Sequence, residues 1–180
     1  LGIGFDSLRN NTTGDYNIAI GYEALYTATE LDKNTAIGYQ ALKVLSGSAG
    51  TGGNTALGYQ AGVSMTTGFS NTLVGSEAGD SITTGYQNTM MGKTAGAAIT
   101  TGAGNVIIGR TAMHVATTAG ACVAIGINAC ETLAASNTDS DGTVAIGYQA
   151  LTALTTGRYN TVLGYQTLMT ATELDKNTAI

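Results

Sequence analysis

The sequence predicts an all-β protein, a parallel β-solenoid in which the chain winds into about ten short coils. Three observations predict this fold: a glycine that recurs with a 17-residue period, a β-prone segment before each of these glycines, and a turn-forming "TTG" motif after many of them. So short a unit holds two short strands and two turns, but not a strand and an ordinary helix. Residues 1–180 are therefore expected to form a single elongated repeat domain.

One marker glycine sets the phase of each repeat. The period is regular except after Gly38 and Gly126, where the next marker glycine comes later than the period predicts. The extra residues predict two insertions, near 43–53 and 131–142, that bulge outward from the coils. The marker glycines are Gly4, Gly21, Gly38, Gly58, Gly75, Gly92, Gly109, Gly126, Gly147 and Gly164.

A longer repeat lies on top of this short period. The string "TATELDKNTAI" occurs at 27–37 and again at 170–180, and the offset between the two copies equals eight coils plus the two insertions. A block of coils has therefore been duplicated. Because the chain begins and ends within a motif, we expect it to be a fragment of a longer fibre.

A short strand precedes each marker glycine. It begins with a β-branched residue in most repeats and ends with a large aliphatic residue, a composition that favours strands. We expect the aliphatic residue directly before the glycine to form the core. These residues are Ile20, Ile37, Leu57, Val74, Met91, Ile108, Ile125, Ile146 and Leu163.

An asparagine stands four positions before the marker glycine in most repeats. Asparagines stacked at a corner can bond to one another and to the turn backbone, which predicts a structural ladder. A ligand-binding column is the alternative. The glycine itself permits a sharp corner or a close backbone approach. The asparagines are Asn17, Asn34, Asn54, Asn71, Asn88, Asn105, Asn160 and Asn177.

Some strands are apolar on both sides. The segments 88–92 ("NTMMG") and 105–109 ("NVIIG") place apolar side chains at successive positions, which face opposite sides of a strand. A thin coil has one interior, so the second apolar face needs a cover. Hydrophobic residues make up 43% of the chain and charged residues 11%, and we infer lateral self-association.

The segments "NTAIGYQAL" (34–42), "NIAIGYEAL" (17–25) and "TVAIGYQAL" (143–151) resemble the head repeats of YadA-like trimeric autotransporter adhesins. They are also similar to repeat tracts of tail-fibre proteins and other virion fibre proteins. The resemblance covers nearly the whole chain, although the unit is longer than the adhesin unit and "GYQAL" replaces a serine-rich continuation. It implies three parallel, left-handed β-rolls assembled into a homotrimeric rod.

The function expected from this resemblance is the structural shaft of a trimeric fibre on a virion, such as a tail fibre, or on an extracellular surface. Expected partners are other copies of the chain, neighbouring fibre or virion proteins, and a host surface glycan. A bacterial adhesin head is the main alternative. An ice-binding solenoid, suggested by the threonines of the "TTG" motifs, and a glycan-cleaving spike are minor ones.

Residues that could carry chemistry are few. The acids are scattered, so no catalytic residue, cofactor or metal ligand set is expected, and the chain is not expected to be an enzyme. Cys122 and Cys130 are interpreted as buried thiols rather than a disulfide, and His114 as a partly exposed turn residue. Asp139 and Asp141, in "SNTDSDG", resemble only part of a calcium loop.

Aromatic residues follow the marker glycine in the outer repeats. Phe5, Tyr22, Tyr39, Tyr59, Tyr148 and Tyr165 hold this position, and the central repeats have Ser76, Lys93, Arg110 and Ile127 there. A structural aromatic ladder is favoured over a sugar-binding face, and the two cations are expected to face a neighbour's acid.

Charge and hydropathy exclude two kinds of partner. The net charge of −5 leaves no basic track for nucleic acid, and no run of about 20 apolar residues predicts a membrane span. The absence of proline suits a regular ladder that uses almost every backbone N–H.

Overall fold

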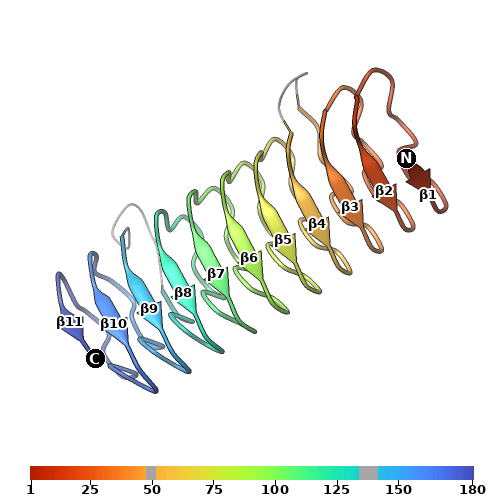
Figure 1. The fold of residues 1–180 in the computed structure, drawn as a ribbon. Helices are drawn as coiled ribbons and strands as arrows, with labels where there is room; N and C mark the ends of the chain where they lie inside the picture. The colour runs from red at the N-terminus through yellow and green to blue at the C-terminus, as the bar shows by residue number, and fades with distance from the viewer. Residues whose placement is uncertain (48–51, 134–141) are drawn as a thin grey trace.

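The chain is a parallel β-solenoid, as the sequence predicts. The computed structural model describes residues 1–47, 52–133 and 142–180, and these residues contain strands and turns but no helix. Eleven strands form one parallel sheet in chain order from β1 to β11, and each coil advances along a straight rod (Figure 1).

Each strand is short and lies just before a marker glycine, as the β-prone segments predict. The strands are β1 (Gly2–Ile3), β2 (Ile18–Ile20), β3 (Thr35–Ile37), β4 (Thr55–Leu57), β5 (Thr72–Val74), β6 (Thr89–Met91), β7 (Val106–Ile108), β8 (Val123–Ile125), β9 (Val144–Ile146), β10 (Thr161–Leu163) and β11 (Thr178–Ala179).

Strand residues pair with their equivalents in the next coil. Ile107 pairs with Ala124, and the register continues across the longer spacings, where Ile37 pairs with Leu57 and Ile125 with Ile146. The two insertions therefore leave the stacking unchanged. Of the residues expected to bulge near 43–53 and 131–142, those at 48–51 and 134–141 lie outside the described residues.

The core is formed by the middle residue of each strand, together with apolar residues of the turns such as Leu25, Met65 and Leu133. The middle residues are fully buried, and alanine is the commonest of them. They are Ala19, Ala36, Ala56, Leu73, Met90, Ile107, Ala124, Ala145 and Val162.

The residue before the marker glycine does not belong to this core, so the sequence prediction is wrong for a single chain. Side chains alternate along a strand, and a buried middle residue turns both of its neighbours outward. Leu57, Met91 and Leu163 are 44–46% exposed. The other residues of this column, only half-buried, are Ile20, Ile37, Val74, Ile108, Ile125 and Ile146.

The marker glycine is required by the close stacking of coils. Gly38 has a φ of +137°, and a Cβ added to it would lie 2.2 Å from the carbonyl oxygen of Gly58 in the next coil. Any side chain there would force the two coils apart. Of the two roles that the sequence predicts for this glycine, a sharp corner or a close backbone approach, the contact with Gly58 confirms the close approach.

Candidate functional site

The asparagines form a continuous buried column along one corner of the rod from Asn17 to Asn105. Asn88 is typical: its backbone N–H and its Nδ2 both donate to Oδ1 of Asn71, at 3.0 and 3.1 Å, and Nδ2 also donates to the carbonyl oxygen of Gly102 at 2.9 Å. Each buried side-chain amide thus forms hydrogen bonds with groups of two neighbouring coils, which is the geometry of a structural ladder.

The column changes composition in two coils. Cys122 takes the place of asparagine, and its N–H donates to Oδ1 of Asn105 at 3.0 Å. Thr143 follows, and its buried hydroxyl has no hydrogen-bond partner among the described residues. The ladder resumes at Asn160, whose Oδ1 accepts the N–H of Asn177 at 3.0 Å.

Cys122 and Cys130 are buried and form no disulfide, as the preferred sequence interpretation predicts. Burial is the main cause that raises the pKa of the Cys130 thiol, and the nearby Cys122 adds to the effect. The Cys130 thiol therefore stays protonated at neutral pH and packs as a small apolar group.

The aromatic residues after the marker glycine stack into a file along another corner. Ring centroids are 5.6 Å apart from Phe5 to Tyr22, 5.2 Å from Tyr22 to Tyr39 and 5.3 Å from Tyr39 to Tyr59. Tyr148 and Tyr165 continue the file after the central break, with centroids 5.2 Å apart. Stacked rings cover one another, so their faces are largely inaccessible to a ligand within the file.

A second stacked pair was missed by sequence reasoning. Phe69 and Tyr86 stack with a centroid distance of 4.9 Å. Both residues stand eleven positions after a marker glycine, in neighbouring repeats. Reading that column for aromatic residues would have found them.

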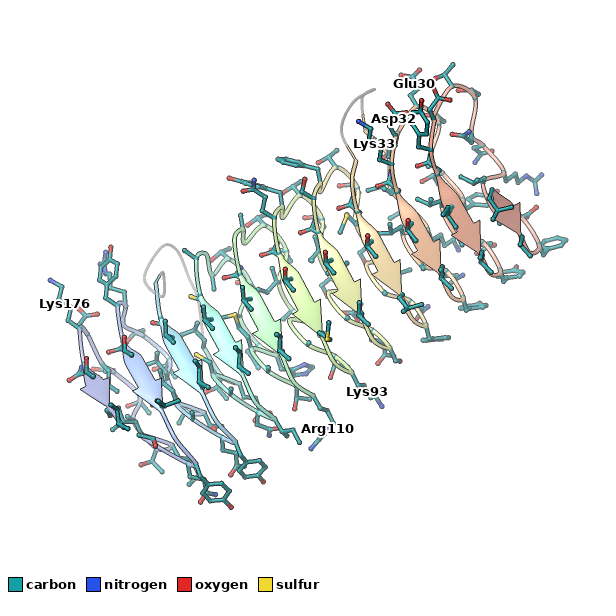
Figure 2. All side chains as sticks on the ribbon, in the orientation of Figure 1. Glu30, Asp32, Lys33, Lys93, Arg110 and Lys176 are labelled. Carbon is teal, nitrogen blue, oxygen red and sulfur yellow. The ribbon has the colours of Figure 1, made fainter. Side chains whose placement is uncertain are left out.

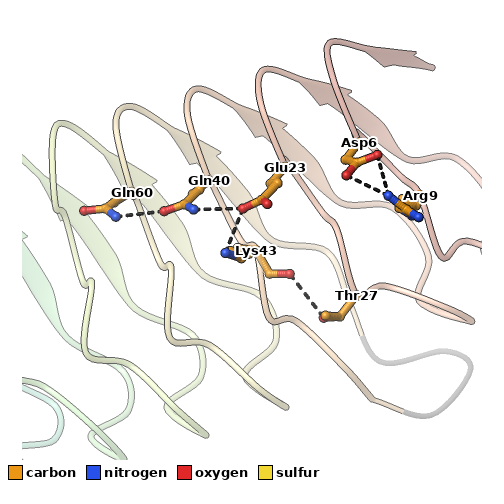
Figure 3. Close-up of polar contacts among 7 residues, drawn as sticks. All are labelled: Asp6, Arg9, Glu23, Thr27, Gln40, Lys43 and Gln60. Carbon is orange, nitrogen blue, oxygen red and sulfur yellow. Dashed lines mark hydrogen bonds and ion pairs between the residues drawn. The ribbon is translucent and has the colours of Figure 1, made fainter.

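A file of polar side chains follows the aromatic corner, two positions after the marker glycine. Gln40 donates through Nε2 to Oε2 of Glu23 at 2.8 Å, and Gln60 donates to Oε1 of Gln40 at 2.9 Å (Figure 3). Lys43 Nζ lies 2.7 Å from Oε2 of Glu23. The row of glutamine amides therefore ends at the Glu23 carboxylate, which also forms an ion pair with Lys43.

These contacts shift two pKa values in opposite directions. The hydrogen bond from Lys43 is the largest cause that lowers the pKa of Glu23 below 4.5, and the bond from Gln40 is the next. The hydrogen bond to Glu23 raises the pKa of Lys43 above 10.5. Asp6 and Arg9 form a separate ion pair at 2.8 Å in the first coil (Figure 3).

Charged side chains lie on two opposite margins of the rod. Lys93 and Arg110 project from one margin, and Glu30, Asp32 and Lys33 lie on the other (Figure 2). Within the described residues, neither Lys93 nor Arg110 forms an ion pair.

The aspartates of the two "TELDK" segments, Asp32 and Asp175, accept hydrogen bonds from the backbone of the neighbouring coil. Oδ1 of Asp32 accepts the N–H of Asp15 at 2.7 Å, and Oδ1 of Asp175 accepts the N–H of Arg158 at 2.8 Å. Glu173 and Asp175 also line a hollow of about 400 Å³ with 156–158 and Leu174. One of the two carboxylates beside this hollow is thus already engaged by the backbone.

The two threonines of a "TTG" motif differ: the first forms a hydrogen bond to the next coil, and the second is exposed to solvent. The first hydroxyl of the motif donates to the next coil, as from Thr66 to the carbonyl oxygen of Thr83 and from Thr83 to that of Thr100, both at 3.1 Å. The second threonine, such as Thr84, is exposed. A single exposed file at a turn weakens the ice-binding alternative.

The remaining candidate residues do not gather into a site. His114 is half-buried, and within the part of the chain that the structure describes its Nδ1 has no hydrogen-bond partner. Burial, followed by the charge of Glu77, raises the pKa of Asp80. Asp139 and Asp141 lie outside the described residues. Among the residues that are described, no three His, Cys, Asp or Glu side chains are grouped so as to hold a metal ion.

Comparison with protein-family models, with curated proteins and with solved structures finds no match to this chain. Within the described part of the chain there is no helix with the length and apolar character to cross a membrane.

Replacing Asn71 with Ala is expected to destabilise the solenoid by about 2–5 kcal/mol. The change leaves the buried N–H of Asn88 and the carbonyl of Gly85 without their partners, and each unsatisfied group costs about 1–3 kcal/mol. Urea unfolding followed by circular dichroism measures the loss. Asn177→Ala is the matched control, because Asn177 is only half-buried; equal losses in both variants would contradict the ladder.

Replacing Lys43 with Gln is expected to raise the pKa of the Glu23 carboxyl toward its ordinary value of 4.5. In the parent chain the depressed pKa stabilises the fold above pH 4.5, and this contribution is lost as the pH falls through the lower folded value. A carboxyl-detected NMR titration measures both proteins. A Glu23 pKa that is the same in the parent and the variant would refute the assigned cause.

Proposed function

We propose that this chain is the structural shaft of a fibre, in which three parallel copies pack side by side along a common axis. The observation that carries the proposal is an apolar face on the outside of the sheet, running the length of the rod. The fibre would belong to a virion, as in a tail fibre, or to an extracellular surface, where it supports attachment to a host.

The outer face consists of the first and last residues of each strand. The last residue is Ile, Leu, Val or Met throughout β2 to β10, and the first is Thr, Val or Ile, so none of these positions is charged. Three-residue strands stacked at ~4.8 Å over ten coils give a face of roughly 10 by 50 Å. The apolar part of this face is the continuous column of Ile, Leu, Val and Met at the last position, beside a first position that is threonine in five of these nine strands. A continuous apolar column of this length is unusual on a soluble monomer and marks an interaction surface.

A second copy of the chain is the best cover for this face. Burying it stabilises the assembly in proportion to the apolar area removed from water. Copies that face a common axis in the same direction can use the same surface at every coil, and a closed ring leaves no face uncovered. The count of three rests on the resemblance of the repeats to trimeric adhesin heads and fibre proteins.

The arrangement of the remaining surface suits a spacer better than a catalyst. The asparagine, glutamine and tyrosine columns bond mainly to their own equivalents in adjacent coils. Such a rod gains length by adding coils, without changing its cross-section. The proposed role is therefore to hold a binding region away from the particle or cell.

Replacing Ile108 with Asp is expected to abolish assembly while leaving the coils folded, because Ile108 lies on the outer face. Replacing its neighbour Ile107 with Asp is expected to unfold the chain, because Ile107 is fully buried and a carboxylate there has no partner. Sedimentation equilibrium measures the assembly, with an expected parent mass of three times 18.1 kDa, and circular dichroism measures the fold.

Val115→Asp is the matched control for this pair. Val115 is also apolar and 45% exposed, but it lies in a turn and not on the outer face of the sheet. We expect this variant to assemble as the parent does. A parent that sediments as a monomer, or an Ile108→Asp variant that still assembles, would contradict the proposed packing.

A further inference from the structure

The aromatic file stops abruptly at Tyr59. The pairing of Leu57 with Val74 places Ser76 next to Tyr59 in the following coil. Tyr59 therefore stacks only on Tyr39, at 5.3 Å, and no ring of the described residues stacks on its other face. The side chain is 48% exposed. A ring-shaped group placed on this face would continue the file where Ser76 interrupts it.

Two cations follow this open ring face. The pairing of Met91 with Ile108 places Lys93 and Arg110 at equivalent positions of neighbouring coils, ~4.8 Å apart along the rod. Like charges that stand opposite each other on paired strands repel. Both side chains are exposed and project from the rod (Figure 2), and neither is paired with a carboxylate of the described residues. An external anion would relieve their repulsion.

We propose that Tyr59, Lys93 and Arg110 form a binding site for an acidic saccharide. The apolar C–H face of the sugar ring lies on the open face of Tyr59, and the sugar carboxylate reaches the Lys93 ammonium and the Arg110 guanidinium. Ser76 and Glu77, both half-buried between them, offer a hydroxyl and a carboxylate to the sugar hydroxyl groups.

The combination of an aromatic face with adjacent cations favours this ligand over simpler anions. Inorganic phosphate would use the cations but not Tyr59. A polynucleotide would need a longer basic track than a chain of net charge −5 provides. The inference deepens the proposed function by naming the surface that a fibre would recognise, and it rests on that function only for its biological role, because one chain supplies every contact.

Isothermal titration calorimetry with two acidic probes tests the site. Trigalacturonate and 3′-sialyllactose are each compared with a neutral counterpart, galactotriose and lactose, at low ionic strength. We expect at least one acidic probe to bind saturably, and its neutral counterpart at least about tenfold more weakly. The double variant Lys93→Gln/Arg110→Gln is expected to lose at least about tenfold in affinity, and Tyr59→Ser several-fold.

The control is Lys33→Gln/Lys176→Gln, which removes the same charge from exposed positions away from the site. It is expected to bind as the parent does. Absence of saturable binding by both acidic probes would overturn the inference, and so would an equal loss in the control variant, which would indicate non-specific attraction of anions. Unchanged affinity in Tyr59→Ser would also overturn it, because the ring face would then be unused.

Sedimentation of the same samples separates this inference from the proposed function. A chain that binds the acidic probe but remains a monomer contradicts only the proposed assembly. An assembled chain that binds neither probe contradicts only the saccharide site. If the Lys93→Gln/Arg110→Gln variant instead loses assembly, the two cations pair with a neighbouring chain, and the saccharide site is wrong.

Discussion

The structure depends on one constraint, the in-register stacking of equivalent residues from coil to coil. Backbone hydrogen bonds and the asparagine column both join each coil to the next at the same position. Side chains of the strands and of the adjoining corners in the described residues therefore lie next to their equivalents. Asparagine on asparagine, glutamine on glutamine and tyrosine on tyrosine are favourable pairs, whereas Lys93 beside Arg110 is not. In-register stacking therefore accounts both for the columns that stabilise the rod and for the repulsion between Lys93 and Arg110 on which the proposed ligand site depends.

Thin coils follow from short strands, and they determine how the rod meets its surroundings. A three-residue strand sends one side chain inward, and this alanine-rich column packs against buried apolar residues of the turns such as Leu25, Met65 and Leu133. The flanking residues, such as Met91, face outward although they are apolar. Apolar side chains that a globular protein would hide internally therefore lie on the outside of the sheet, where the proposed assembly would cover them.

The sequence was sufficient for the period, the strands and the positions of the asparagine column, because each depends on a residue type with few alternative uses. It was insufficient for the core: Ile107 and Ile108 are identical neighbours, and in so short a strand no alternation shows which one faces inward. Pairs between coils were also missed. Glu23 and Lys43 meet across neighbouring coils although they hold different positions relative to the marker glycine, so comparing equivalent positions does not pair them.

The central claim, that the outer face of the sheet is covered by other copies of the chain, is tested most directly by oxidising Met90 and Met91. The two residues are adjacent, but Met90 is fully buried in one chain and Met91 is 44% exposed. Mass spectrometry after brief peroxide treatment is predicted to show both methionines protected in concentrated protein, and Met91 alone becoming reactive on dilution. Rapid oxidation of Met91 at every concentration would contradict the claim.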